Sequence, residues 1–339
     1  MFSGSEYQAA RERAASLDRP ERGRIVVSGA DRASYLQGLL TNDVTALEAG
    51  EGCYAAYLTP QGRMIADLYV YELGDVILLT VPREQTVPVL EKLDQFVFSE
   101  DVQLGNASAA FSTTAIVGPG APTIVSGLTG IAEADLAAWP EHGNGRGQFD
   151  GHSVIVTRVT DVGEAGYDLH VEAPCAVRFS QGLDDAGVPA LNAETAEALR
   201  IEGGIPRFNR DMDQETIPLE AGIESRAISF SKGCYVGQEV IIRVLHRGHG
   251  RVARKLVGLL CDTDTVPIAG ATVTVGGRDI GHVTSSALSG ALNKPIALAY
   301  LHRDFLTPGT AVSIDGQTAV VRQLPFVSAR SESQLPNHG

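Results

Sequence analysis

An eight-residue stretch, KGCYVGQE at 232–239, gathers groups that could do chemistry. Gly233 allows a sharp turn that leaves the thiol of Cys234 accessible, and the ammonium of Lys232 would favour the thiolate form. No histidine stands in the motif, and a lone cysteine is commonly an inert core residue. The stretch therefore predicts either a reactive thiol or a structural turn, which Gln238 and Glu239 would lock.

A metal site is not predicted, although histidines follow this motif. The four cysteines of the chain are scattered and form no CxxC pair. His246 and His249 are three residues apart, but no nearby cysteine or carboxylate completes a set of ligands. We expect neither a metal ion nor disulfides.

A second candidate is Asp67, in the strand-like sequence RMIADLYVY. Period-two alternation puts it on one face with Arg63, Ile65, Tyr69 and Tyr71. A carboxylate among apolar and aromatic neighbours must be solvated, paired with a cation such as Arg63, or bound to a ligand. The sequence leaves these alternatives open.

A third stretch, LRIEGGIPRFNRDMDQETIPLEAGI at 199–223, is dense in mixed charge. It contains Arg200, Glu202, Arg207 and Arg210. Such density usually indicates ion pairs on a surface. Because the charges flank Gly-Gly and Ile-Pro loop elements, the wall of a polar site is the alternative.

The elements that position these residues follow from apolar periodicity. Residues 53–81 read as three strands separated by Pro-Gln-Gly and Leu-Gly-Asp turns, which is an antiparallel meander. Helices are predicted where apolar residues recur at helical spacing, and Asn192 suits the N-cap of the last of them. The helical ranges are 29–44, 83–98, 175–187 and 192–204.

The remaining segments complete an α+β region followed by a small β-barrel. Residues 140–152, PEHGNGRGQFDGH, mimic a phosphate loop but lack the Gly-Lys-Ser/Thr that would follow it, so we expect a flexible connection. After about residue 250, apolar runs alternate with turns such as VGGRD, TPGT and IDGQ, which is typical of a barrel. The basic motif lies at the junction, where small-molecule clefts often form.

Composition excludes several classes of protein. The chain has 339 residues, 44% of them hydrophobic and 20% charged, as in ordinary globular proteins. No apolar run is long enough to span a bilayer, and the N-terminus has no apolar signal core, so we expect a cytoplasmic protein without membrane contact. A net charge of −14 argues against nucleic-acid binding. The segment 226–255 nevertheless carries seven Lys/Arg and one Glu, which would suit a small anionic ligand or a solvated strip.

Taken together, four stretches resemble the folate-binding YgfZ family, which is itself similar to the T-protein (aminomethyltransferase) of the glycine cleavage system. KGCYVGQE is the most discriminating, because the T-protein generally lacks its cysteine. The four stretches are spread from about residue 25 to residue 255. The four are GADRASYLQGLLTNDV, YAAYLTPQGRMIADLYVY, LRIEGGIPRFNRDMDQETIPLEAG and KGCYVGQEVIIRVLHRGHGRVARKL.

The resemblance implies a GcvT/YgfZ-like α+β fold, in which antiparallel sheets with flanking helices form a ring of subdomains around a folate cavity. We expect a polar leader at 1–20 and a folate-binding region of two subdomains at 21–248. Within that region, 52–105 is a meander plus helix. The barrel spans 249–326, and a disordered tail follows at 327–339.

The resemblance also assigns roles to residues. Asp67 falls where the T-protein has an aspartate beside the reactive folate nitrogen, and Asp168 falls where it has a glutamate that holds the pteridine. Asp161 replaces a tyrosine that helps to frame the folate. The remaining folate contacts would come from Arg200, Glu202, Tyr235, Gln238 and Arg243, and Cys234 and Lys232 would join Asp67 as catalytic residues.

The implied function is tetrahydrofolate binding in support of iron–sulfur protein assembly or repair, with links to tRNA modification. The cofactor would be tetrahydrofolate or a derivative, with its glutamate tail drawn toward Lys232 and Arg243. We expect a monomer with iron–sulfur client proteins as partners. The alternatives are a folate-dependent aminomethyltransferase and a scaffold that no longer binds folate.

Overall fold

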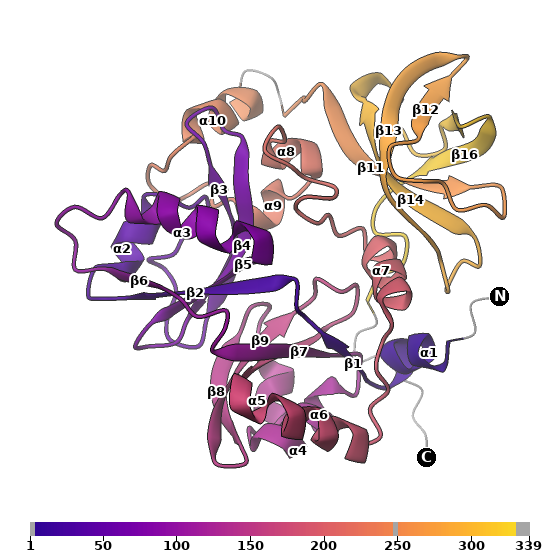
Figure 1. The fold of residues 1–339 in the computed structure, drawn as a ribbon. Helices are drawn as coiled ribbons and strands as arrows, with labels where there is room; N and C mark the ends of the chain where they lie inside the picture. The colour runs from indigo at the N-terminus through magenta and orange to yellow at the C-terminus, as the bar shows by residue number, and fades with distance from the viewer. Residues whose placement is uncertain (1–3, 247–249, 330–339) are drawn as a thin grey trace.

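The computed structural model describes residues 4–246 and 250–329 of the chain. Two antiparallel five-stranded sheets and a closed barrel form three lobes, which confirms the predicted α+β fold with a C-terminal barrel. Figure 1 shows the lobes around three helices that lie between residues 193 and 227. These are α7 (Ala193–Glu202), α8 (Pro218–Ala221) and α9 (Glu224–Ala227).

The predicted meander forms three of the five strands of the first sheet. Its strands run in the order β3-β4-β5-β2-β6. Apolar side chains on one face pack against α2 and α3, and those on the other face pack against α8, α9 and α10. The bounds are β2 (Arg22–Ser28), β3 (Gly52–Leu58), β4 (Met64–Glu72), β5 (Ile77–Pro82), β6 (Gln103–Asn106), α2 (Arg32–Gln37), η1 (Arg83–Gln85), α3 (Thr86–Asp94) and α10 (Gln238–His246).

A bulge in this sheet changes one face assignment. The register of β3 and β4 shifts so that Leu58 pairs with Met64 and Ile65 has no partner. Ile65 therefore packs with the α2–α3 core, whereas Asp67 lies on the opposite face. Of the alternatives for Asp67, pairing with Arg63 is not observed, since Arg63 instead pairs with Glu215, 2.9 Å away.

The second sheet has the order β1-β7-β10-β9-β8, with α4, α5 and α6 packed on one face. Residues 140–152, expected to be a flexible connection, include all of strand β8 and the turn into β9. Their glycines allow close packing, because a Cβ on Gly145 would lie 2.9 Å from the Trp139 ring. The bounds are β1 (Ala15–Asp18), β7 (Phe111–Val117), β8 (Asn144–Phe149), β9 (His152–Val159), β10 (Gly166–Glu172), α4 (Ala121–Thr129), α5 (Glu133–Ala138), η2 (Ala173–Cys175) and α6 (Ala176–Asp185).

The segment expected to be a polar leader is structured. Residues Ser5–Glu12 form helix α1, and β1 follows as an edge strand of the second sheet. Tyr7, Ala9 and Ala10 are buried against α7, so three well-spaced apolar residues suffice to anchor an otherwise polar helix.

The barrel closes in the order β11-β14-β13-β12-β15-β16 around its own apolar core. Its outer surface packs on α7 through Ala198 and Ile201. Of the tail expected to be disordered, residues 330–339 lie outside the described residues. The bounds are β11 (Arg254–Cys261), β12 (Thr272–Val275), β13 (Arg278–Leu288), β14 (Pro295–His302), η3 (Arg303–Phe305), β15 (Ala311–Ile314) and β16 (Gln317–Arg322).

None of the helices in the described residues is long and apolar enough to cross a membrane. Within the same residues, no three His, Cys, Asp or Glu side chains are grouped to hold a metal ion. His249 and the side chain of His246 lie outside the described part of the chain.

Candidate functional site

A cavity of about 520 Å³ lies where the two sheets meet α7 and the segment that follows it. Its walls come from the β1–β2 connection, the middle of β4, the end of β5, the turn before β10 and residues 205–210. The volume falls in the range usual for small-molecule sites. Of the predicted site residues, Asp67 and Arg200 line it.

Asp67 is the group whose bonding is incomplete. Its side chain is buried, and its Oδ2 accepts a hydrogen bond from the Tyr54 hydroxyl at 2.9 Å. Its Oδ1 has no partner among the described residues. Burial raises the pKa of Asp67, while the nearby charge of Arg22 opposes the rise. An unsatisfied buried carboxylate oxygen is costly, so this oxygen is available to a donor on a ligand.

Aromatic rings surround this carboxylate. The rings of Tyr54 and Tyr69 lie 5.0 Å apart, and Tyr69 lines the cavity. The Arg22 guanidinium lies 5.1 Å over the Tyr69 ring, and the His142 ring is 5.3 Å from it. The cavity therefore offers the Tyr69 ring next to a carboxylate oxygen that has no partner among the described residues, as a heteroaromatic ligand with an N–H donor would require.

Asp161 and Asp168 belong to a buried arginine cluster. Arg19 donates to Asp161 at 2.8 and 3.1 Å and to Asp168 at 3.1 Å, and Arg22 also bonds Asp161. The two guanidiniums hold the pKa of Asp161 well below its usual range, against the effect of burial. Burial raises the pKa of Asp168 to about 6 because only Arg19 bonds it. Asp161 lines the cavity, whereas Asp168 is not among its lining residues.

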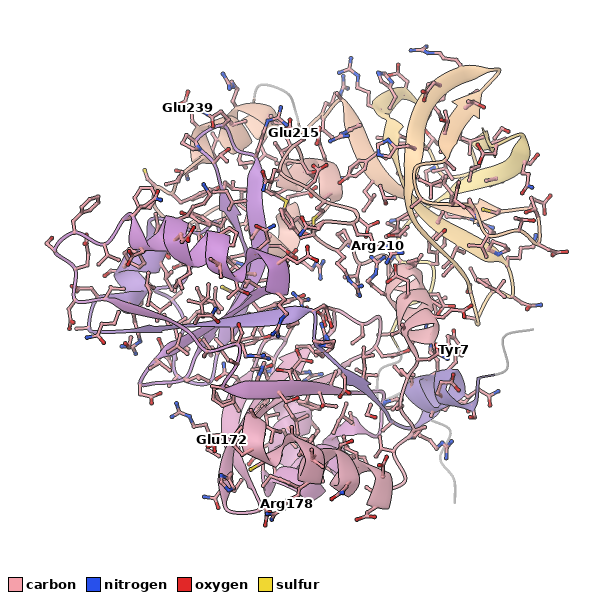
Figure 2. All side chains as sticks on the ribbon, viewed as in Figure 1. Tyr7, Glu172, Arg178, Arg210, Glu215 and Glu239 are labelled. Carbon is pink, nitrogen blue, oxygen red and sulfur yellow. The ribbon has the colours of Figure 1, made fainter. Side chains whose placement is uncertain are left out.

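Three arginines form the cationic part of the wall. Arg83, Arg207 and Arg210 line the cavity, and the latter two side chains are 41% and 47% exposed. Both lie within 3.6 Å of the single carboxylate of Glu197, which leaves the group with excess positive charge. Figure 2 shows Arg210 next to one end of α7, near the centre of the molecule. Such a group would bind an anion.

Two predicted folate contacts are instead engaged in the fold. The Arg200 guanidinium bonds Asp211 at 2.8 Å, Glu197 at 2.6 Å and Ser285 of the barrel at 2.9 Å. Glu202 accepts hydrogen bonds from Tyr7, Arg11 and Ser289 and is fully buried. Both side chains hold α7 to its neighbours, and Glu202 does not line the cavity.

The KGCYVGQE motif lies away from this cavity. Lys232 Nζ donates to the carbonyls of Gln37, Leu40 and Asn42 at 2.6–2.8 Å, so its ammonium caps the end of α2. Cys234 is exposed. The motif packs on the β3–β4 turn, where a Cβ on Gly237, at φ +85°, would lie 2.5 Å from the Thr59 carbonyl.

The other predicted residues of this region lie outside the cavity as well. Tyr235 is buried in the core beside α10, and the Lys232 ammonium lies 5.3 Å over its ring. Gln238 begins α10, and Arg243 is exposed on it. Within the described residues, none of Lys232, Cys234, Tyr235, Gln238 or Arg243 lines the cavity with Asp67.

Sequence reasoning missed four contributors. Arg19 lies at the end of the predicted polar leader, residues 1–20, and Arg22 lies just beyond it. His142 lies in residues 140–152, which were predicted to be a flexible connection. Tyr54 pairs with Tyr69 in the register of the meander, so alternation could have found it. His142 adopts φ +66°, a conformation that is uncommon for residues other than glycine. No local pattern signals the contacts of the arginines, since Arg19 and Asp161 are 142 positions apart.

The fold and the cavity define a three-lobed protein whose central cavity combines an aromatic ring, a buried carboxylate and arginine side chains. The GCVT N-terminal domain model matches residues 2–232, and the glycine cleavage T-protein C-terminal barrel domain model matches residues 254–327. The chain belongs to the glycine cleavage T-protein family.

Relatives support this assignment. An aminomethyltransferase of Streptomyces avermitilis is 31% identical over 317 residues, which cover 91% of this chain and 84% of that protein. An aminomethyltransferase of Halothermothrix orenii is 30% identical over 335 residues, or 95% and 90% of the two chains. The crystal structure of glycine cleavage system aminomethyltransferase T from Bartonella henselae has the same fold, with a TM-score of 0.83, 24% identity and coverage of 96% and 89%.

Proposed function

We propose that this chain binds tetrahydrofolate, or a derivative, in the cavity lined by Asp67 and takes part in one-carbon transfer of the aminomethyltransferase type. The free Oδ1 of Asp67 is the observation that carries the proposal. Tetrahydrofolate is the substrate that aminomethyltransferases use, and the chain belongs to their family. The comparisons favour this function over the YgfZ-type function as the leading candidate.

The residues present fit a reduced folate. Its pterin would lie against the rings near Tyr69, with an N–H donating to Oδ1 of Asp67. Its glutamate carboxylates would meet Arg83, Arg207 and Arg210. These arginines replace the expected partners Lys232 and Arg243, which lie elsewhere.

Within such a site, Asp67 would orient the reacting nitrogen and stabilise positive charge that develops there. Tyr54 fixes the carboxylate by its hydrogen bond to Oδ2, so that Oδ1 faces the donor. Asp161 neutralises Arg22, which prevents that arginine from pairing with Asp67 instead.

Turnover tests this function directly. The purified chain is mixed with an aminomethyl-lipoyl carrier protein and tetrahydrofolate, and the formation of methylenetetrahydrofolate and ammonia is followed. We expect product with the wild type and a loss of at least about ten-fold in rate with Asp67→Asn. Absence of folate-dependent product release with the wild type would exclude transferase activity.

A YgfZ-type role in iron–sulfur protein maintenance is a second candidate, which the exposed thiol of Cys234 favours. Folate would still bind beside Asp67, but the essential chemistry would lie on the outer surface. Cys234→Ala should then abolish complementation of a deletion strain while leaving tetrahydrofolate affinity unchanged. If Cys234→Ala complements the deletion fully and still turns over, the YgfZ-type role is excluded and the transferase function remains.

A further inference from the structure

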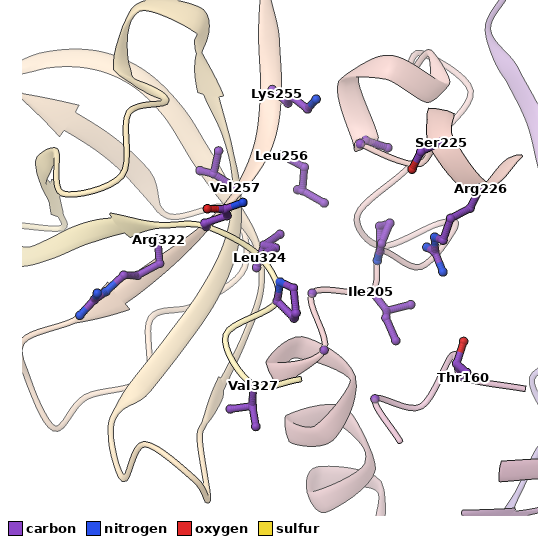
Figure 3. Close-up of a pocket in the computed structure, with 18 of the residues that line it drawn as sticks. Thr160, Ile205, Ser225, Arg226, Lys255, Leu256, Val257, Arg322, Leu324 and Val327 are labelled. Atoms are coloured by element: carbon purple, nitrogen blue, oxygen red, sulfur yellow. The ribbon is translucent and has the colours of Figure 1, made fainter. Parts of the chain in front are cut away.

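A second cavity of about 710 Å³ lies between the barrel and the helices α8 and α9. Figure 3 shows it bordered by β11 on one side and by the segment carrying Ser225 and Arg226 on the other. Only Ile205 and Pro206 line both this cavity and the one that contains Asp67. The two spaces are therefore neighbours, with residues 205–206 and the turn 160–163 between them.

The barrel side of the second cavity is apolar. Leu256 of β11 contributes to it, together with Leu324 and Val327 beyond β16, whereas the Val257 side chain packs inside the barrel. Leu256 is buried in the cluster that joins the barrel to α7, and Leu324 packs against that cluster. This wall is part of a rigid interface, so it would bind apolar surface of a ligand without rearrangement.

The opposite side carries a cation without a counter-ion. Arg226 is exposed into the cavity, and its guanidinium has no ion-pair or hydrogen-bond partner among the residues that the structure describes. By contrast, the neighbouring Lys255 Nζ lies 3.2 Å from Glu224. The cavity's own carboxylate, Glu141, accepts a hydrogen bond from Thr160 at 2.8 Å.

Aromatic contact keeps the Arg226 guanidinium in position. It lies 5.3 Å over the ring of Tyr54, the same residue that bonds Asp67 from the other side. A guanidinium stacked on a ring keeps its N–H edges free, and a fixed guanidinium loses little entropy when it binds a carboxylate in bidentate fashion.

From this geometry we propose that the second cavity binds an amphipathic monocarboxylate. Its carboxylate pairs with Arg226, and its apolar body lies on Leu256 and Leu324. The site is distinct from the folate cavity and goes beyond the proposed function. Because Arg226 alone lacks a counter-ion in this wall, the charge of the ligand is the main determinant of affinity.

Calorimetric titration with 4-phenylbutyrate tests the proposal, with the neutral 4-phenylbutanamide as the matched ligand. We expect saturable one-to-one binding of the acid and much weaker binding of the amide. Arg226→Gln should weaken binding of the acid by at least about ten-fold, since a charge-assisted hydrogen bond is lost. Arg322→Gln is the matched control, because Arg322 also lines the cavity but points away from it in Figure 3.

Four results would overturn the proposal. They are no saturable binding of the acid, equal binding of acid and amide, unchanged binding in Arg226→Gln, and an equal loss in Arg322→Gln. A tetrahydrofolate titration of the same proteins reports on the other cavity. Failure of folate binding there would leave this test intact, so the two proposals fail separately.

Discussion

At the scale of single residues, the site depends on carboxylates that share deep burial but not the same neighbours. Asp161 has two guanidiniums bonded to it, which hold its pKa low. Asp67 accepts a hydrogen bond from a neutral hydroxyl, and burial raises its pKa. The buried positive charge is thus neutralised at Asp161, which leaves Asp67 as a hydrogen-bond acceptor for a ligand.

Asp168 gives a pH prediction at this scale. Burial raises its pKa from 3.8 to about 6, so the folded state binds a proton in this interval that the unfolded chain has released. Its contribution to the free energy of unfolding is therefore full below pH 3.8 and is lost as the pH rises to about 6, by up to about 1.4 kcal/mol per pH unit. Asp168→Asn should abolish this loss in urea denaturation measured across the interval.

The test compares the free energy of unfolding of variant and wild type at each pH, because His170 changes this free energy with pH in the opposite direction. Burial lowers its pKa to about 3, so stability rises with pH as the unfolded histidine loses its proton. Parallel stability curves for wild type and Asp168→Asn would show that Asp168 has an ordinary pKa.

At the scale of elements, the ammonium of Lys232 joins the KGCYVGQE motif to the end of α2. Three carbonyls near the C-terminus of that short helix depend on it. Lys232→Met should lower the free energy of unfolding by about 2–4 kcal/mol, since it leaves buried carbonyls without a donor. Urea denaturation measures this change.

Cys234→Ala is the matched control for the motif. An exposed side chain without packing contacts contributes little, so the change should stay within about 0.5 kcal/mol. A stable Lys232→Met protein would contradict the capping role and return Lys232 to the candidates for chemistry.

Elements with strong local signals could be predicted from the sequence. The meander, the barrel and the helix capped by Asn192 match the structure, and the Asn192 side chain accepts from the Thr195 N–H. The bulge at Ile65 could not be predicted from the sequence, because it depends on how β4 pairs with the neighbouring strand β3. Helix α1 was missed because few of its residues are apolar.

The site was predictable only in part, for a related reason. Asp67 stands out because a carboxylate is unusual within a β-strand. The contacts of Arg19 and Arg22 depend on the docking of two sheets, which leaves no local pattern. The KGCYVGQE motif attracted attention because of its residue types, yet its lysine bonds backbone carbonyls and its Gly237 allows close packing.

At the scale of the whole molecule, a buried ion cluster joins the lobe of the second sheet, α7 and the barrel. Arg11 of α1 pairs with Glu164, beside the cavity turn, and with Glu202 of α7, which also bonds Ser289 of the barrel. Arg11→Met should destabilise the protein by about 3–5 kcal/mol, because it leaves buried carboxylates without a cation. Thermal or urea unfolding provides the measurement.

Arg13→Met serves as the control, because Arg13 is exposed on the turn after α1 and makes no ion pair among the described residues. It should change stability by less than about 0.5 kcal/mol. Equal effects of the two variants would mean that the cluster does not couple the lobes.

The most direct test of the account is calorimetric titration of tetrahydrofolate into the wild type, Asp67→Asn and Asp75→Asn. Asp75 is an exposed carboxylate that does not line the cavity. We predict saturable binding to the wild type and to Asp75→Asn, and binding at least about ten-fold weaker to Asp67→Asn, because a charge-assisted hydrogen bond is lost. Equal affinity of Asp67→Asn and the wild type, or no saturable heat with the wild type, would contradict folate binding beside Asp67.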